Sequence, residues 1–185
     1  MAGKHRVFPA ARAGRLMGRF RSLVNPPVRL LGRFIQKGDT VLDLGCGPGY
    51  FSLPIARLVG AGGMVIAADV QEEMLEHLRR AAEEEGLLSR MRLHRTRSDS
   101  LDLEMPPIVS FTLAFHVLHE TGDIERMLSE IFRITRPGGL LLIAEPYFPV
   151  GANEFDETVS AAMRAGFTGL ESPPILFSRA ALLRK

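Results

Sequence analysis

The strongest constraint on the fold is a single run of residues, Val41-Leu42-Asp43-Leu44-Gly45-Cys46-Gly47-Pro48-Gly49-Tyr50-Phe51. Its pattern predicts a buried strand that breaks into a glycine-rich turn and then a helix. Glycines at alternate positions remove every Cβ where the backbone bends through positive φ or comes close to a bound molecule. The helix that follows offers unpaired N–H groups in its first turn. The run therefore predicts a turn that contacts a ligand; a strand-to-helix turn without a ligand is the alternative.

From residue 40 onward, short Val, Ile and Leu runs alternate with helical segments, which indicates a parallel sheet covered on both faces. Strands are expected near residues 40–44, 64–68, 91–95, 109–115, 139–144, 167–171 and 175–183. Helices are expected near residues 50–59, 71–86, 123–135 and 153–165, with little room for one between residues 97 and 108. Only Ser172-Pro173-Pro174 separates the last two strands, so these are expected to pair antiparallel. The predicted fold class is α/β, with seven strands of which one is reversed.

The size and composition of the chain fit one compact unit in a reducing compartment. A chain of 185 residues can bury a sizeable core without disulfides or a structural metal. Its one cysteine, Cys46, excludes an internal disulfide and any cysteine-based zinc site, so the cytoplasm is the expected location. No run has the length of a membrane-spanning helix, and none near the start is typical of a signal peptide, so a soluble protein is expected.

Residues 1–38 differ from the rest in charge and are interpreted as a basic helical extension or lid before a ligand-binding domain over 39–185. They carry nine Lys or Arg and no Asp or Glu, in a chain whose net charge is +2. Helical spacing of apolar residues predicts an amphipathic helix within residues 12–24 and a short second helix over 28–35. Such an extension can meet nucleic acid, anionic lipid or an acidic substrate, or can serve only helix solubility.

The order of residue types in the glycine turn distinguishes between two kinds of cofactor. A nicotinamide fingerprint places its third glycine where Tyr50 stands and needs no acid two residues before the first glycine. Here Asp43 holds that position, and the resulting D-x-G-x-G-x-G run resembles the first motif of class I S-adenosylmethionine-dependent methyltransferases of the small-molecule type. Asp69 and the segment Arg136–Pro146 extend the resemblance, which covers about residue 28 to the end. It implies a three-layer, Rossmann-like fold and transfer of a methyl group from S-adenosyl-L-methionine by in-line displacement.

The resemblance also implies which residues bind the cofactor. Asp69 ends the second strand, twenty residues after Gly49, where an acid can accept hydrogen bonds from both ribose hydroxyls. The alternative is that Asp69 caps the next helix. The remaining cofactor-binding residues implied by the family's motifs are Asp43, Gly45, Cys46, Gly47 and Gly49 around the methionine end, Val70 and Asp99 beside the adenine, and Phe115 at the end of the fourth strand. Met74 is a second adenine candidate or a core residue, and Asp99 can equally form a local loop turn.

Candidates for acceptor chemistry follow the fourth and fifth strands. His116, His119 and Glu120 are placed to remove a proton from an acceptor, and Tyr147 is placed to contact it. A histidine near a strand end can instead be a helix cap or a packing residue. The segment departs from the family in one respect, since Val109-Ser110 stands where an aromatic or aliphatic residue followed by Asp is usual. No metal is expected.

The predicted function is therefore an S-adenosylmethionine-dependent methyltransferase that acts on a small molecule. One alternative is the same chemistry on RNA or protein, recruited by the basic residues 1–38. Another is a domain that binds the cofactor but catalyses nothing, which Ser110 leaves open. Contact of the basic helix with an anionic membrane, to reach a lipid-like acceptor such as a quinone precursor, also fits its amphipathic pattern.

Overall fold

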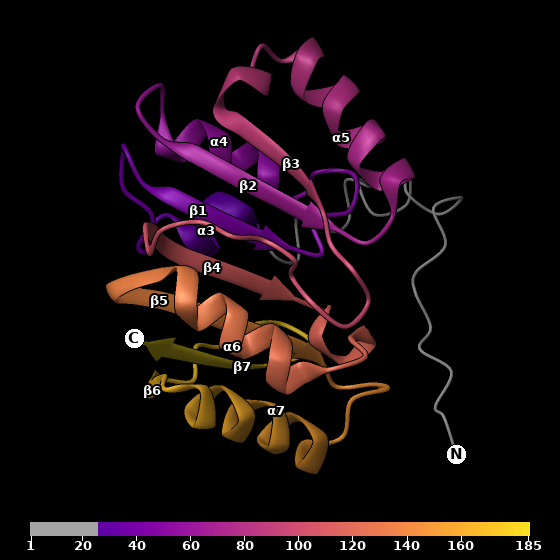
Figure 1. Cartoon of the computed structure of the whole chain (residues 1–185), viewed down its shortest axis with the longest axis vertical. Coiled ribbons are helices and arrows are strands. Elements are labelled where there is room, and N and C mark those ends of the chain that lie inside the picture. The colour runs from indigo at the N-terminus through magenta and orange to yellow at the C-terminus, as the bar shows by residue number, and fades with distance from the viewer. Residues whose placement is uncertain (1–25) are drawn as a thin grey trace.

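The computed structural model describes residues 26–185, which form one α/β unit (Figure 1). Its strands are β1 Thr40–Leu44, β2 Met64–Asp69, β3 Met91–Arg95, β4 Val109–Phe115, β5 Thr135–Pro146, β6 Thr168–Glu171 and β7 Ser178–Arg184. Its helices are α3 Pro27–Leu31, α4 Ser52–Val59, α5 Glu72–Glu84, α6 Ile124–Ile134 and α7 Ala152–Ala165, with short 3-10 turns η2 Leu88–Arg90 and η3 Leu118–Glu120. The amphipathic helix predicted within residues 12–24 lies outside the described residues.

The seven strands form one sheet in the order β3-β2-β1-β4-β5-β7-β6. The strands from β1 to β5 run parallel, whereas β7 is antiparallel to both of its neighbours. The predicted seven-stranded, mostly parallel sheet with the last strand reversed is thus confirmed. Because β7 is reversed, its first residue, Ser178, pairs with Pro146 at the end of β5. The start of β7 therefore lies at the edge where the parallel strands end.

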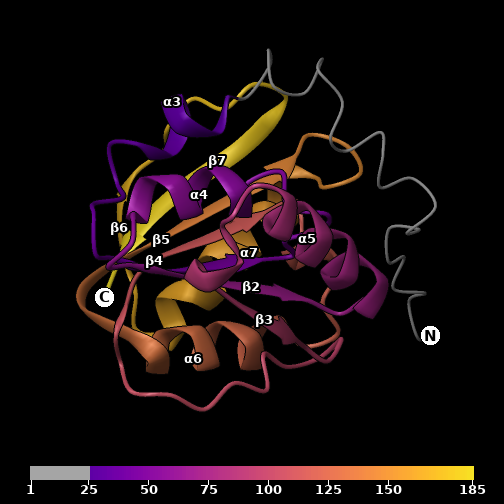
Figure 2. The same cartoon turned by 90° about the horizontal axis from the view of Figure 1, so that it is seen from above.

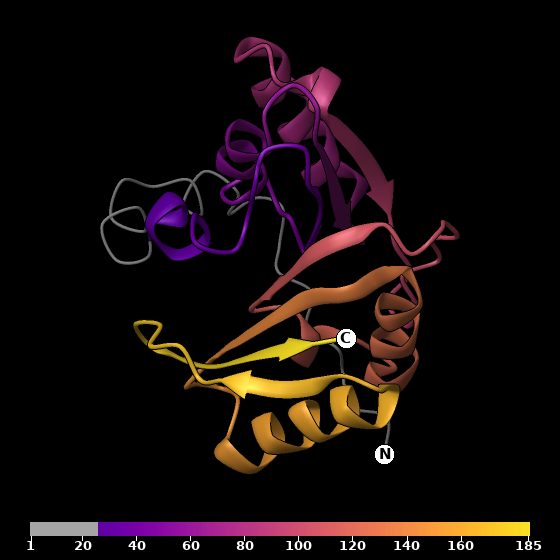
Figure 3. The ribbon, with the colours of Figure 1, turned by 90° about the vertical axis from the view of Figure 1, so that its left-hand side faces the viewer.

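Helices cover both faces of the sheet, and each face has its own core (Figures 2 and 3). Side chains of α3, α4 and α5 pack on one face, while α6 and α7 cover the other. Neighbouring strand residues divide between the faces, as Val41 and Leu42 do. The loop between β3 and β4 has no helix, and its Leu101 and Leu103 supply the missing apolar cover.

Three element boundaries differ from the sequence-based expectation. Strand β7 begins at Ser178 rather than near 175. Strand β5 begins at Thr135 rather than near 139, because α6 ends at Ile134 and Gly138-Gly139 lies within the strand as an irregularity. The register with β4 shifts there, from Val109 opposite Thr135 to Phe111 opposite Leu140, and Gly138 has φ +75°. Helix α3 is shorter than predicted and ends before Gly32. Among the described residues, no helix is both long and apolar enough to cross a membrane.

Candidate active site

The glycine turn lies between the end of β1 and the start of α4, at the carboxyl edge of the sheet (Figure 1). Two of its amides, those of Gly45 and Cys46, donate to the carbonyl oxygen of Ala68, at 2.8 Å and 3.0 Å. The Asp43 carboxylate is buried and accepts a hydrogen bond from the hydroxyl of Ser52 at 2.5 Å. This contact joins β1 to the first residue of α4, so Asp43 holds together the two elements that flank the turn.

The three glycines have different physical reasons to lack a side chain. All have positive φ, +69° at Gly45, +52° at Gly47 and +101° at Gly49. A Cβ on Gly45 would stand 2.8 Å from the Cβ of Val117, whereas one on Gly47 would meet no atom within 4 Å. The space beside Gly47 is therefore open on the side where a ligand can approach the backbone.

Asp69 holds the turn from the neighbouring strand β2. Its two carboxylate oxygens accept hydrogen bonds from the amides of Gly47 and Gln71, each at 2.9 Å. Burial raises the pKa of Asp69, and the amide hydrogen bonds partly oppose that rise. The amide of Val70 also contacts this carboxylate, and because each oxygen can accept two hydrogen bonds, capacity remains for a ribose hydroxyl. The helix-cap alternative is not observed, because Gln71 is the N-cap of α5 and, among the described residues, no side chain caps that helix.

The thiol of Cys46 lies in the core rather than in open space. The residue is buried, and burial raises the pKa of its thiol well above the ordinary value, with Asp43 and Asp69 acting in the same direction. The thiol therefore stays protonated. Its Sγ lies 3.5 Å from the carbonyl oxygen of Gly47, so only the backbone of Cys46 can take part in the predicted cofactor site.

Of the residues predicted beside the adenine, Val70 is partly exposed and Met74 is buried. Asp99 lies on the surface, 3.9 Å from the guanidinium of Arg126. Phe115 is buried at the end of β4, with its ring centroid 4.7 Å from that of Phe51. The roles of these residues toward the cofactor stay predictions.

A histidine and a glutamate form the tightest polar contact at the carboxyl edge. The Nδ1 atom of His119, on η3, lies 2.5 Å from Oε2 of Glu145, near the end of β5. Glu145 is almost fully buried, and its other oxygen accepts the amide hydrogen of Leu118 at 2.8 Å. The hydrogen bond to Glu145 is the main reason why the pKa of His119 is raised, while partial burial acts in the opposite direction. Nε2 of His119 lies 3.9 Å from a carboxylate oxygen of Glu120.

His116 has a different environment, since it links the end of β4 to the start of β7. Its backbone has φ +59°, which is uncommon for a residue other than glycine. Its Nε2 lies 2.7 Å from the hydroxyl oxygen of Ser178, and its amide donates to the carbonyl oxygen of Ala144 at 2.8 Å. His116 is therefore tied to the ends of two neighbouring strands.

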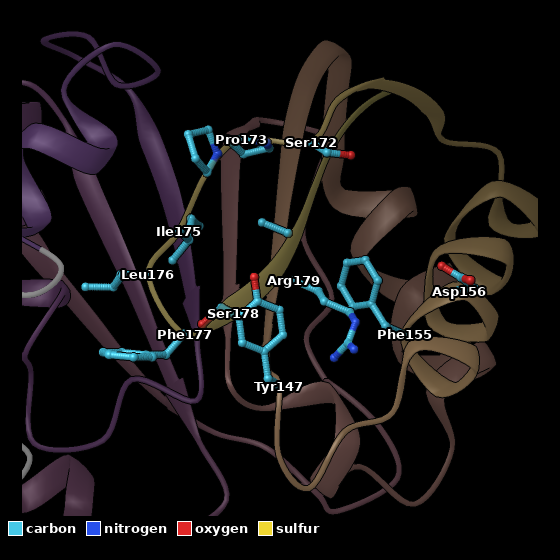
Figure 4. Close-up of a pocket in the computed structure, with 12 residues that line it drawn as sticks. Tyr147, Phe155, Asp156, Ser172, Pro173, Ile175, Leu176, Phe177, Ser178 and Arg179 are labelled. Carbon is cyan, nitrogen blue, oxygen red and sulfur yellow. The ribbon is translucent and has the colours of Figure 1, made fainter.

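Tyr147 lines a pocket of about 860 Å³ (Figure 4). The pocket lies between the end of β5, helix α7 and the segment 172–180 that leads into β7. Tyr147 is more than half exposed, and the guanidinium of Arg179 stands 5.0 Å from the centre of its ring. The amide of Tyr147 donates to the carbonyl oxygen of Phe177 at 3.1 Å, which holds the two loops together.

The structure thus brings the glycine turn together with Asp43 and Asp69, and His119 together with Glu120. Sequence reasoning missed Ser52, Glu145, Ser178 and Arg179. The sequence could have indicated Glu145. An acid directly after the apolar residues 140–144 of a central strand is unusual and needs a partner when it is buried. Among residues 26–185, no cluster of His, Cys, Asp and Glu has the arrangement of a metal site.

Comparisons with known proteins agree with this geometry. Residues 41–139 match the family model described as "Methyltransferase domain". The "Ubiquinone/menaquinone biosynthesis C-methyltransferase UbiE" of Escherichia coli O1:K1 is 30% identical over 116 residues, 63% of this chain and 46% of that protein. The protein of the same name from Cronobacter sakazakii is 31% identical over 116 residues, with the same coverage. The chain thus spans less than half the length of these curated relatives.

Solved structures show the same fold over almost the whole chain. A SAM-dependent methyltransferase from Aquifex aeolicus aligns with a TM-score of 0.83 and 22% identity, covering 96% of this chain and 99% of that one. The [4+2]-cyclase SpnF aligns with a TM-score of 0.66 and 19% identity, covering 98% and 84%. The open space at Gly47 and the unused acceptor capacity of Asp69 fit a nucleoside cofactor with an amino-acid tail. The chain belongs to the methyltransferase-domain family, and its cofactor is S-adenosyl-L-methionine.

Proposed function

We propose that this protein transfers a methyl group to a small-molecule acceptor, and that His119 removes the proton which the acceptor loses. The observation that carries this proposal is the hydrogen bond of His119 to buried Glu145. His119 follows β4, which lies beside β1 and its glycine turn, and Glu145 is near the end of β5, the next strand of the sheet. A base at that position is within the region where a cofactor on the glycine turn meets its acceptor.

The proposed role of the cofactor-binding residues is to hold the cofactor in position. Asp43 supports the turn and favours a cationic amino group, the glycines admit the chain of the methionine end, and Asp69 accepts hydrogen bonds from the ribose. When bound, S-adenosyl-L-methionine supplies a methyl group on a positively charged sulfur. The protein's main task is then to align the acceptor and exclude water.

The contact with Glu145 gives His119 a defined proton arrangement. Glu145 is an acceptor, so Nδ1 of His119 carries the proton of the neutral ring and Nε2 is left as the basic atom. When Nε2 takes a proton from the acceptor, the charge that forms on the ring is stabilised by Glu145. This arrangement suits an acceptor whose O–H, N–H or activated C–H becomes acidic enough for a histidine.

A small acceptor is supported by the relatives and by the short connections of the described fold. The relatives' name refers to C-methylation in ubiquinone and menaquinone biosynthesis, which concerns small molecules. At the carboxyl edge, only residues 147–151 link β5 to α7. An RNA or protein acceptor recruited by residues 1–38 is the competing hypothesis.

The first test is calorimetric titration with S-adenosyl-L-methionine of the wild type, Asp69→Ala and the control Glu104→Ala. Glu104 is an exposed carboxylate in the loop before β4, so its removal leaves the site intact. We expect binding by the wild type and the control, and at least tenfold weaker binding by Asp69→Ala. Absence of binding by the wild type would overturn the proposal, and equal binding by all three would remove Asp69 from the ribose role.

The second test is a screen for transfer, with a methyl-labelled cofactor and a panel of phenols, catechols, quinols and hydroxybenzoic acids followed by mass spectrometry. A labelled product formed by the wild type and strongly reduced in His119→Gln supports the proposed base. Labelling of total RNA or of protein, with none of the small molecules, would favour the competing acceptors. Binding without any transfer is the outcome expected of a non-catalytic domain or of one that catalyses another reaction, as the cyclase with the same fold does.

A further inference from the structure

The pocket beside Tyr147 contains a cation that has no carboxylate partner. Arg179 is partly buried, and its Nη1 donates to the carbonyl oxygen of Val150 at 3.0 Å. No ion pair within 4.0 Å joins it to any acid among residues 26–185. Residues 1–25 contain no Asp or Glu, so they offer no side-chain carboxylate either. No carboxylate of the described residues is therefore placed to neutralise Arg179, so its charge is available to a bound anion.

The acids nearest to Arg179 in the fold have other contacts or positions. Glu145 pairs with Arg179 across β5 and β7, so the two side chains project from the same face of the sheet. Yet Glu145 gives its two oxygens to His119 and to the amide of Leu118. Asp156 lines the same pocket, but in Figure 4 it lies on α7 beyond the ring of Phe155.

The surroundings of Arg179 are aromatic. Figure 4 shows the side chain of Arg179 in the same pocket as the rings of Tyr147 and Phe155, and its guanidinium stands 5.0 Å from the centre of the Tyr147 ring. The contact with Tyr147 and the hydrogen bond to Val150 hold the guanidinium in place, so little side-chain entropy is lost when an anion binds. A fixed guanidinium fork matches a planar carboxylate with two parallel hydrogen bonds.

One cross-strand pair links the pocket to the candidate base, although His119 is not among the residues that line the pocket. Arg179 is directly opposite Glu145 in the strand register, and Glu145 holds His119. Opposed residues in antiparallel strands have Cα atoms about 4.5–5.5 Å apart. On the other side, Ser178 lines the pocket and contacts His116, which follows Phe115 at the end of β4. A molecule bound by its anionic end at Arg179 can thus extend toward His119.

We propose that Arg179, Tyr147 and Phe155 form the acceptor-binding site, and that the acceptor is an aromatic carboxylic acid whose carboxylate pairs with Arg179. This inference rests on the proposed function, and it adds the chemical class of the substrate. The ring of the acceptor lies against Tyr147 and Phe155, while its reacting group is directed toward His119. Such a site discriminates against neutral aromatic compounds, because they leave the guanidinium without a charged partner.

The test uses benzoate and its neutral analogue benzamide, titrated into protein saturated with S-adenosylhomocysteine and followed by ligand-observed NMR. The variants are Arg179→Met, Arg179→Lys and the control Arg184→Met, which removes an exposed arginine from the other end of β7. We expect the wild type and the control to bind benzoate at least tenfold more tightly than benzamide. Arg179→Met should lose that preference, and Arg179→Lys should keep part of it.

Titration of S-adenosylhomocysteine into each variant distinguishes failure of the proposed acceptor site from failure of the proposed function. Unchanged cofactor binding by Arg179→Met, together with loss of the benzoate preference, supports the inference. Equal binding of benzoate and benzamide by the wild type, no benzoate binding, or an unchanged preference in Arg179→Met would overturn it. In those cases intact cofactor binding would leave the proposed function in place, whereas failure of the wild type to bind the cofactor would remove both.

Discussion

Nδ1 of His119 and Oε2 of Glu145 are 2.5 Å apart, although 26 residues separate them in the chain. The side chain of His119 is 15% exposed and that of Glu145 only 1%. A buried carboxylate against a partly open imidazole raises the pKa of the imidazole and fixes which nitrogen holds the proton. Several measurable consequences follow from this pair and from the neighbouring glycine turn.

Removal of the Glu145 charge should lower the pKa of His119. Glu145→Gln keeps an oxygen for the amide of Leu118 but replaces the anion beside Nδ1 with a neutral amide. Titration of the His119 ring by two-dimensional NMR should give a pKa above 6.5 in the wild type and a lower one in the variant. Glu104→Gln, which removes an exposed charge from the loop before β4, is the matched control, and the His119 titration in it should equal that of the wild type. An identical His119 titration in the wild type and Glu145→Gln would contradict the assigned contact.

The same pair makes stability depend on pH with a defined sign. The folded-state pKa of His119 is raised above its unfolded value, so its contribution is fully present below pH 6.5 and is lost as pH rises through the folded pKa. The difference in free energy of unfolding between the wild type and His119→Gln should therefore shrink as pH increases from about 6. Urea denaturation at a series of pH values measures it, and a difference that grows with pH would contradict the sign.

The hydrogen bond between Ser52 and Asp43 should contribute measurably to stability. Ser52→Ala removes one hydrogen bond to a carboxylate that is 2% exposed, and hydrogen bonds to charged groups are worth about 1.5–3 kcal/mol. We expect a loss of that size in the free energy of unfolding, measured by urea denaturation. Ser129→Ala, on the exposed side of α6, should change stability by less than about 0.5 kcal/mol. A loss no larger than that of the control would show that the contact is unimportant.

Gly47 and Gly45 should respond differently to alanine. Gly47→Ala introduces a side chain into open space at φ +52°, so we expect a loss of about 1–2 kcal/mol in stability but at least tenfold weaker cofactor binding. Gly45→Ala adds a clash with the stiff Val117 side chain and should be less stable than Gly47→Ala. Urea denaturation and calorimetry give the two readouts.

Two further variants control this comparison. Val117→Ala should restore part of the stability lost in Gly45→Ala, because it removes the Val117 Cγ2 atom that would lie 2.6 Å from a Cβ at residue 45, while the Val117 Cβ at 2.8 Å remains. Gly62→Ala, at a glycine with open space and without positive φ, should change neither property appreciably. If Gly47→Ala binds the cofactor normally, the open space beside Gly47 is not where the cofactor lies.

Acidification should weaken cofactor binding through Asp69. Burial raises the pKa of this carboxylate, so it takes up a proton at a higher pH than an exposed Asp does, and a protonated carboxyl accepts ribose hydrogen bonds less well. The affinity of the wild type should fall as pH drops toward that pKa, and Asp69→Asn should lack this part of the pH dependence. Calorimetric titrations between pH 5 and 8 compare the two. Parallel curves would mean that other groups cause the effect.

The sequence by itself determined the order of the elements, the glycine turn and its two acids. These are local properties: alternating apolar runs decide between strand and helix, and a glycine is needed wherever the backbone must turn through positive φ. Asp43 was predicted from its place two residues before the first glycine of the turn, and Asp69 from its place at the end of the second strand. The expected parallel sheet then placed them at one edge.

Only the tertiary structure decided which side chains meet across that edge. Glu145 belongs to an apolar strand, and nothing in its neighbours along the chain indicates His119 as its partner. Arg179 is opposite Glu145 because β7 runs antiparallel to β5, and this register depends on the hairpin and on the packing of both faces. Asp99, which in sequence could equally bind the adenine or form a loop turn, lies on the surface beside Arg126. Local pattern fixes the elements, whereas the pairing of distant strands fixes the distances on which the chemistry depends.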